Sequence, residues 1–285
     1  MKEQIRALPW GTRKRLHYLE FKIFWEGRAN RGDLKSAFGI SIPQASADIA
    51  RYQDLTPQNI IYNSSAKYYI PTEEFNPILI KPSADGYFSE IISSPSIENN
   101  TSSVDDYVGF VPNPTRIIDV PILKTIIQAI KNKRKITVDY RSFKNPQAGN
   151  AREITPHSFG SDGFRWHVRA YCHTNNKFKD YVLGRIVSVS DSAETEVDPK
   201  SDRQWFNFID VIIGPNPNQN EDQKYLIAMD YGMTNQRLVI RCRVALLYYL
   251  MKKLRIDIRD TERPGNEQQI VAINIDEISA AMNSD

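Results

Sequence analysis

Cysteine is scarce in this sequence: Cys172 and Cys242 are the only two in 285 residues. Two cysteines cannot build a disulfide framework or a four-ligand zinc site, so neither is expected. The sequence also lacks a run of about 20 apolar residues, the length needed to cross a bilayer. The N-terminus has no apolar run followed by a small-residue cleavage site, as a secretory signal would. These absences predict a cytoplasmic protein that has no membrane partner.

Motifs for catalysis and cofactor binding are missing as well. The chain has no glycine-rich phosphate loop, no HExxH and no CxxC. His157, His167 and His173 lie close together in the sequence, but the carboxylate pattern that would support a three-histidine metal site is absent. We therefore expect no catalytic residues, no metal and no cofactor, with an enzyme acting on nucleic acid as the weaker alternative.

Charge is unevenly distributed along the chain, although the net charge is only +3. Residues 1–70 contain 11 Lys and Arg against 6 Asp and Glu, so the positive excess lies in this first segment. A basic excess in one module is typical of nucleic-acid binding. A chain of this length also exceeds one ordinary core, so two or three domains are expected.

The first 55 residues follow a helix-turn-helix pattern. A helix is predicted from Thr12 to Gly27, a second over 31–38, and a third that Ser41 caps and that runs to about Gln53. A tight glycine turn before a polar-started helix is the helix-turn-helix layout, and a plain three-helix bundle is the alternative. The start of a recognition helix enters the major groove, so its outward residues are the expected base readers.

Two strand-like runs follow, Ile60–Tyr62 and Lys67–Ile70, around a polar turn. This hairpin predicts a wing, and residues 10–72 resemble winged helix-turn-helix regulators. Arg13, Lys14, Arg15 and Lys22 are candidate phosphate contacts on the first helix. The expected base readers are Ser41, Gln44, Ser46 and Ala47, and the other DNA-binding residues predicted here are Arg13, Arg31, Arg51 and Lys67.

Beyond a Pro-, Ser- and Asn-rich stretch, a helix over 121–131 leads into strand-like runs between Ile136 and Val189. Their spacing predicts a largely antiparallel sheet or small barrel of about five strands. In the run 166–171, alternation places His167, Arg169 and Tyr171 on one face and Trp166, Val168 and Ala170 on the other. The first face suggests a site for an anion, whereas Trp166 and Cys172 are expected in the core.

The run Arg165–Cys172 resembles the signature strand of the WYL domain. Tyr140-Arg141, Ile154–His157 and Asp180–Ile186 resemble its flanking motifs in order and spacing. WYL domains are Sm-like β-barrels that bind effectors in bacterial transcription regulators. The effector-binding residues that the resemblance implies are Tyr140, His157 or Ser158, His167, Arg169 and Arg185.

Two arginines, a histidine and a tyrosine suit a phosphate-bearing small molecule or a nucleic-acid fragment as the effector. Strand alternation allows only one of His157 and Ser158 to face the pocket, and the sequence leaves open which. The alternative for Arg169 and Arg185 is structural ion pairing with an acidic residue, for which Asp139, Glu153 and Asp180 are the candidates.

The last segment predicts a small α+β domain, with a polar linker over 192–202 before it. Strands are expected over 206–213, 225–229, 238–241, 255–259 and 269–275, with a helix over 244–254. WYL regulators often carry a C-terminal domain of this size that makes dimer contacts. The expected boundaries are 1–72 for the winged module, 73–119 for a connecting segment, 120–192 for the WYL barrel and 193–285 for the dimerisation domain.

The sequence thus predicts a multi-domain α+β protein that binds double-stranded DNA. The leading hypothesis is a homodimeric transcriptional regulator on an inverted-repeat operator. It most closely resembles WYL repressors of bacterial phage-defence operons, which implies derepression when an effector binds. The alternative is a passive nucleic-acid-binding adaptor without an effector response.

Overall fold

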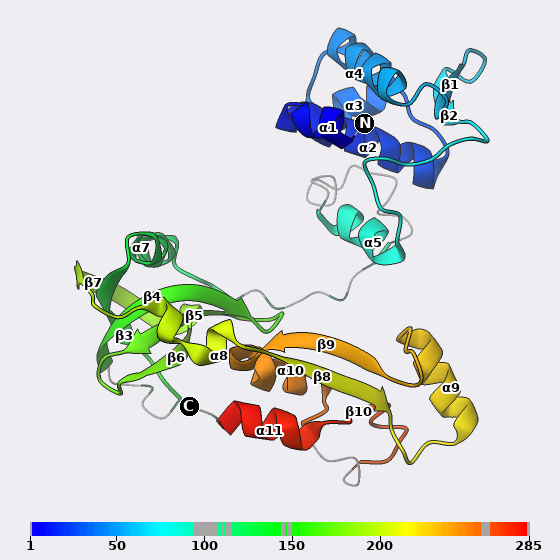
Figure 1. The fold of residues 1–285 in the computed structure, drawn as a ribbon. Helices are drawn as coiled ribbons and strands as arrows, with labels where there is room; N and C mark the ends of the chain where they lie inside the picture. Colours follow the sequence, from blue (N-terminus) through cyan, green and yellow to red (C-terminus); the bar gives the residue numbers. More distant parts are fainter. Residues whose placement is uncertain are drawn as a thin grey trace. The chain divides into compact units, whose positions relative to one another are not determined.

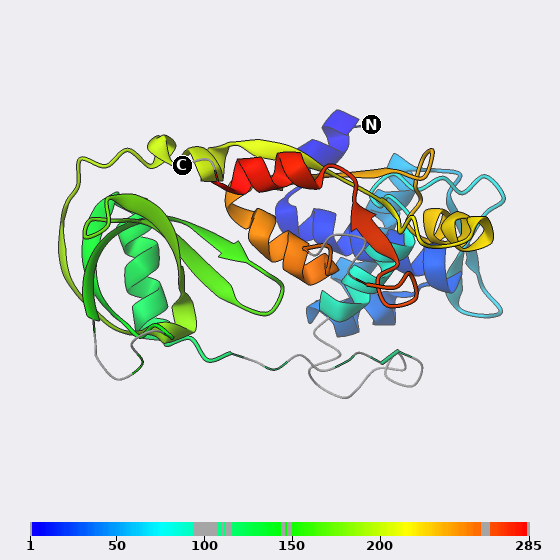
Figure 2. The same ribbon diagram turned by 90° about the horizontal axis from the view of Figure 1, so that it is seen from below.

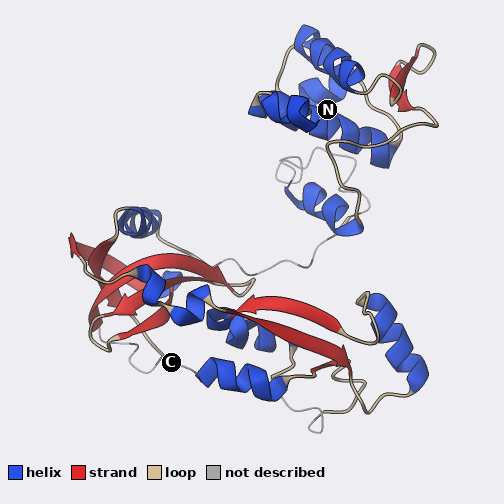
Figure 3. Ribbon diagram, viewed as in Figure 1, coloured by secondary structure: helices blue, strands red, loops and turns tan. Residues whose placement is uncertain are grey.

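The computed structural model describes residues 2–93, 108–109, 111, 114, 116–143, 146, 150–257 and 263–283. The chain divides into two compact units, residues 1–110 and 111–285 (Figure 1). Helices and strands occur in both, which confirms the α+β class (Figure 3). The polar stretch over 94–107 lies outside the described residues.

The N-terminal unit contains the predicted helix-turn-helix and wing. The two strands of the wing pair antiparallel, with Ile61 opposite Ile70. Phe75 and Leu79 pack on the core of the three helices, and the Phe21 and Tyr87 rings stack, so this unit extends past residue 72. Its elements are α1 (Lys2–Ala7), α2 (Trp10–Glu26), α3 (Arg31–Phe38), α4 (Ile42–Leu55), β1 (Ile60–Asn63), β2 (Tyr68–Pro71) and α5 (Ala84–Ser93).

Local sequence sets the ends of these helices. Gly27 and Gly39 end α2 and α3 in the left-handed conformation that glycine adopts without strain. Asn30 and Asp33 form a capping box at the start of α3. α2 begins at Trp10 rather than at Thr12, because Pro9 occupies its N-cap position.

The middle of the second unit is a five-stranded antiparallel sheet packed against α7 (Val120–Lys131). Its strand order is β6-β5-β4-β3-β7, which leaves β6 and β7 at the two edges. The described strands therefore form an open sheet, and the closed Sm-like barrel is not confirmed. The strands are β3 (Arg134–Tyr140), β4 (Asn150–Ser161), β5 (Trp166–Cys172), β6 (Lys177–Val182) and β7 (Ile186–Glu194), with the short helix η1 (Leu183–Arg185) between the last two.

The two faces of β5 follow the predicted alternation, with one exception. Val168, Ala170 and Cys172 are buried in the core beneath α7, as expected. Trp166 is 54% exposed, so its assignment to the core is wrong. It is the first residue of the strand, beside the β4–β5 turn, where the core no longer covers its side of the sheet.

The rest of the second unit is a three-stranded sheet of order β10-β8-β9, with α10 and α11 packed on its core (Figure 2). The strands are β8 (Phe208–Pro215), β9 (Leu238–Arg243) and β10 (Ile270–Ala272). The helices are η2 (Pro199–Ser201), α8 (Arg203–Phe206), α9 (Glu221–Asp230), η3 (Val244–Leu246), α10 (Leu247–Leu254) and α11 (Ile275–Asn283).

Two strand predictions in this region are wrong. Tyr225–Met229 lies inside α9, because Asn220 and Gln223 form a capping box that starts a helix there. A short apolar run has no periodicity that separates strand from helix. Arg255 ends α10 in the left-handed conformation instead of starting a strand, and residues 258–262 lie outside the described residues.

Candidate functional site

The exposed start of α4 is the first candidate surface. The Ser41 side chain caps the helix by accepting a hydrogen bond from the backbone amide of Gln44 at 3.3 Å. Ala45 and Ile49 are buried against the other helices, which turns Gln44 and Ala47 toward solvent. Ser46 is half-buried, and its hydroxyl donates to the Ile42 carbonyl at 3.0 Å. The predicted base readers therefore lie together on one helix.

Five cations that the sequence predicts as DNA contacts are also exposed: Arg13, Lys14, Arg31, Arg51 and Lys67. None of the ion pairs among the described residues involves these side chains. Two other candidates on α2 are instead paired: Arg15 with Asp48 at 2.6 Å, and Lys22 with Glu26 at 2.5 Å. The Lys14 ammonium lies 4.3 Å from the centroid of the Trp10 ring.

The wing is held against the helices by backbone pairing. The Ala29 amide donates to the Tyr69 carbonyl at 3.0 Å, and the Tyr69 amide donates to the Ala29 carbonyl at 2.8 Å. At the wing tip, the Asn63 side chain accepts from the Ser65 and Ala66 amides, and Lys67 follows with a positive φ of 59°. Lys67 therefore projects from a tight, internally bonded turn.

A buried carboxylate fixes the segment that follows the wing. Glu20 on α2 is fully buried and accepts from the backbone amides of Ile78, Leu79 and Ile80 at 2.6–2.9 Å. It also accepts from the Tyr52 hydroxyl at 2.8 Å. Burial raises the pKa of Tyr52, so its hydroxyl stays a donor.

Arg169 is the centre of the second candidate site, on the sheet face opposite α7. Its Nε and Nη2 donate to the two oxygens of Asp202 at 2.7 and 3.0 Å. Nη2 also donates to Gln204 at 3.1 Å, and Nη1 to Asp180 at 3.3 Å. The alternative of structural ion pairing includes Asp180 among the predicted partners of Arg169, but not Asp202. All three guanidinium nitrogens of this buried arginine thus have partners.

Asp202 joins the sheet to the segment that follows it. It is 1% exposed and caps α8 by accepting from the Trp205 amide at 3.1 Å. Burial raises the pKa of Asp202, but hydrogen bonds from His157 and Arg169 outweigh that effect and hold it at about 2. The polar run that predicts a linker therefore ends in a buried, ionised residue.

His157 and Ser158 both reach this network, although strand alternation predicts only one of them. A register shift between Pro156 and Ser158 interrupts the alternation, as a β-bulge does. His157 Nε2 lies 2.9 Å from the Asp202 carboxylate, which can only accept, so this nitrogen carries a proton. His157 Nδ1 lies 3.0 Å from the Ser158 hydroxyl.

His167 lies on the same sheet face but has different neighbours. Its ring packs on that of Tyr249 from α10, with centroids 4.7 Å apart. The Tyr249 hydroxyl donates to Asp180 at 3.0 Å. Burial lowers the pKa of His167, so the neutral imidazole is the form at neutral pH.

The remaining predicted effector residues do not join this network. Tyr140 is buried in the core beneath α7, where its ring packs edge-on against Tyr181. The Arg185 guanidinium lies 4.4 Å above the exposed Phe143 ring. Arg169 and Arg185 therefore have different surroundings. Sequence reasoning missed Asp202, Gln204 and Tyr249, and the only local signal was an Asp placed to cap a short helix.

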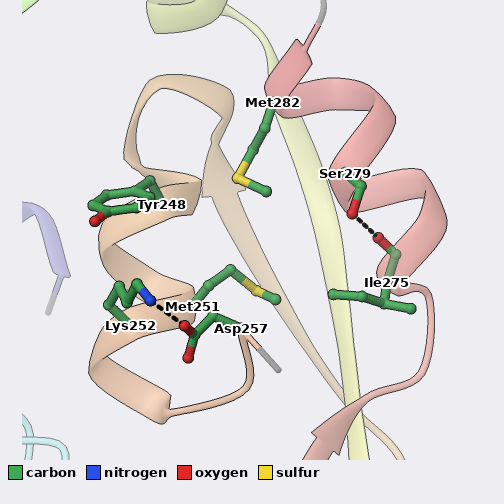
Figure 4. Close-up of a pocket in the computed structure, with 7 residues that line it drawn as sticks. All are labelled: Tyr248, Met251, Lys252, Asp257, Ile275, Ser279 and Met282. Atoms are coloured by element: carbon green, nitrogen blue, oxygen red, sulfur yellow. Dashed lines mark hydrogen bonds and ion pairs between the residues drawn. The ribbon is translucent and has the colours of Figure 1, made fainter. Parts of the chain in front are cut away.

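A pocket of about 300 Å³ lies between α10 and α11 (Figure 4). Lys252 and Asp257 form an ion pair at this pocket. None of the predicted effector residues lines it, and the lining residues are Tyr248, Met251, Lys252, Asp257, Ile275, Ser279 and Met282. Within the described ranges, no cluster of His, Cys, Asp or Glu could hold a metal ion. No helix in that part of the chain is long and apolar enough to span a membrane.

Three family models match the chain in sequence order. Residues 11–93 match the BrxR transcriptional regulator winged helix-turn-helix domain. Residues 121–190 match the WYL domain, and residues 208–278 match the BrxR transcriptional regulator C-terminal dimerization domain. The three matches confirm the predicted order of modules, and the first includes the segment that Glu20 holds.

Three curated relatives are similar over nearly the whole chain, and each is named DNA-binding transcriptional repressor CapW. The protein of Escherichia coli strain KTE188 is 33% identical over 96% of this chain and 92% of its own. That of Stenotrophomonas maltophilia is 32% identical, covering 97% and 94%. That of Pseudomonas aeruginosa is 32% identical, covering 94% and 91%. The chain belongs to the WYL-domain transcriptional regulators with a winged helix-turn-helix and a C-terminal dimerisation domain, the non-enzymatic family of the CapW repressors.

Proposed function

We propose that this protein is a sequence-specific DNA-binding repressor that acts in the cytoplasm as a homodimer on an inverted-repeat operator. The observation that carries the proposal is a winged unit that exposes both the start of α4 and the tip of the wing. It presents Gln44, Ser41 and Ala47 with exposed cations that have no ion-pair partner in the described structure. Exposed cations bind phosphates, and polar side chains at the start of a recognition helix read base edges.

The direct experiment measures binding of the full chain to a labelled duplex taken from upstream of its own gene. We expect tight binding that a scrambled duplex does not compete for, and footprints over two half-sites about one helical turn apart. Equal affinity for both duplexes would contradict the proposal. Lys177→Ala, an exposed cation on β6, is the matched control and should bind as the wild type does.

The homodimer part of the proposal rests on α9, within the region that matches the dimerisation domain. Ile227 packs into the core, whereas Tyr225, Leu226 and Met229 are 71%, 51% and 60% exposed on the rest of the helix. Such an apolar surface is typical of an interface, and the family match indicates a second copy of this chain as its occupant.

Light scattering on wild type and Leu226→Asp tests this surface. We expect a dimer that becomes a monomer on substitution. Tyr248→Asp, a change at an exposed aromatic on α10, should leave the dimer intact. A wild-type monomer would contradict the homodimer, and a dimer unaffected by Leu226→Asp would contradict the assignment to α9.

The effector part of the proposal places ligand sensing at Arg169. Arg169 joins the WYL sheet to Asp202 and Gln204, so a phosphate that replaces Asp202 on Arg169 would release α8 from the sheet. Operator affinity would then fall and a phage-defence operon would be derepressed. The ligand class is a phosphate-bearing small molecule or a nucleic-acid fragment, for which His157 and Ser158 supply further polar contacts.

One observation favours the alternative of DNA binding without an effector response. Every nitrogen of the Arg169 guanidinium already has a partner, so a ligand must compete with a buried carboxylate. The two functions separate on adding short oligonucleotides and cyclic nucleotides to the operator complex. Release of DNA from the wild type but not from Arg169→Lys supports sensing at this site. If none of the added nucleotides releases DNA from the wild type, the alternative is supported.

A further inference from the structure

The side-chain amide of Gln44 donates a hydrogen bond to a buried carboxylate, that of Asp48. Asp48, one turn further along α4, is 2% exposed, and its Oδ1 accepts from Gln44 Nε2 at 3.2 Å. Arg15 on α2 donates to both oxygens of Asp48, through Nε at 2.6 Å and Nη2 at 3.2 Å. Arg15 Nη2 also lies 3.3 Å from the Thr12 hydroxyl. The amide of an exposed base reader is therefore linked to a second helix.

Stability alone is a poor reason for this arrangement. A buried ion pair contributes little more than apolar residues of the same volume, because the loss of hydration offsets the attraction. Its best-attested use is to fix one arrangement among several. Here the ion pair contacts the exposed side chain of Gln44 near the start of α4. The Asp48 carboxylate accepts from both Arg15 and Gln44 and so links the two side chains.

The carboxylate decides which end of the Gln44 amide faces outward. Asp48 accepts and cannot donate when ionised, so it binds the NH₂ end of the amide and leaves Oε1 free. One N–H of the same NH₂ group remains available to donate to a base. Gln44 therefore presents an acceptor beside a donor, which matches N6 and N7 of adenine in the major groove. Guanine presents two acceptors there and does not match.

We infer that Asp48, held by Arg15, is a positioning residue that sets the base preference of Gln44 to adenine. This inference rests on the proposed DNA-binding function. Asparagine in place of Asp48 can donate as well as accept, so the Gln44 amide can turn over and present its NH₂ group outward. A guanine is then accepted, and the preference for adenine is reduced.

The test is selection from a randomised duplex DNA library, followed by affinity measurements on single-base variants of the selected site. We expect wild type to select adenine at one position of each half-site, and Gln44→Ala to lose selection at that position alone. Asp48→Asn should reduce the adenine-over-guanine preference there at least fivefold, and change affinity for unselected DNA less than twofold. In the Gln44→Ala background, Asp48→Asn should have no effect on preference.

A second variant covers the case in which Asp48→Asn does not fold. Arg15→Met with Asp48→Leu replaces both charges with apolar volume and removes the anchor of Gln44. It should lose the same preference while retaining the thermal melt of a folded domain. Equal losses on all sequences, or an unchanged preference in either folded variant, would overturn the inference. If the wild type selects no sequence at all, the proposed function fails instead.

Discussion

Arg51 of the N-terminal unit and Arg169 of the WYL sheet are the same residue type in opposite circumstances. Arg51 on α4 is exposed and takes part in none of the ion pairs of the described structure, whereas Arg169 on β5 is buried among Asp180, Asp202 and Gln204. Arg185 is between the two extremes, half-buried over an aromatic ring.

This difference separates two roles for a cation. An exposed arginine keeps its donors for a phosphate that arrives from outside. A buried arginine with carboxylate partners holds parts of the chain together, and its removal leaves those carboxylates without a counter-charge. Residue type indicates an anion partner in both cases, and only the structure shows whether that partner belongs to the same chain.

The largest expected effect is the loss of Arg169. Arg169→Ala leaves Asp202 buried and short of its main partner, so we expect a loss of about 3–5 kcal/mol in the free energy of unfolding of the second unit. Urea denaturation of wild type and variant measures it. Arg185→Ala, the control on the same sheet, should change stability by less than about 1 kcal/mol. Similar losses for the two would remove the contrast between them.

Acid should weaken the same network. The pKa of Asp202 is about 2 in the folded state against an ordinary 3.8. Because the folded pKa is the lower one, the stabilisation is complete above about pH 4 and is lost as the pH falls through 2. The shift corresponds to about 2 kcal/mol. Denaturation series at pH 5 and pH 2 should show this decrease in wild type, and Asp202→Asn should show less of it.

Removal of an exposed cation should affect DNA and leave the fold unchanged. Arg51→Ala or Lys67→Ala should lower affinity for all sequences by roughly tenfold or less, and each should reduce the salt dependence by about one phosphate contact. Binding titrations over a range of salt concentrations measure both effects. A change in base preference would contradict the role of these residues as phosphate contacts.

The smallest effect is expected at the edge of the Arg169 network. Tyr249→Phe removes the hydroxyl that donates to Asp180 at 3.0 Å, while the ring can still pack on His167. Asp180 is partly accessible to water, so we expect a loss of only about 1 kcal/mol. Thermal unfolding measures it, and a loss as large as that of Arg169→Ala would indicate that Asp180 matters more than Asp202.

Local patterns predict most of the secondary structure. α3 follows from Gly39 and its polar start, the wing from two short runs around a polar turn, and α7 and β3–β7 from periodicity and turn clusters. The sequence predicts a strand within α9, because the apolar run over 225–229 fits either a strand or a helix. The Arg169 network joins residues 33 and 35 positions apart, and no sequence period encodes such a contact.

The central claim is that the exposed cations of the winged module bind operator DNA and that those of the WYL sheet do not. Its most direct measurement is the slope of operator affinity against salt concentration, for wild type, Arg51→Ala and Arg185→Ala. The account predicts a slope reduced by about one for Arg51→Ala and unchanged for Arg185→Ala. A slope reduced by Arg185→Ala and unaffected by Arg51→Ala would contradict it.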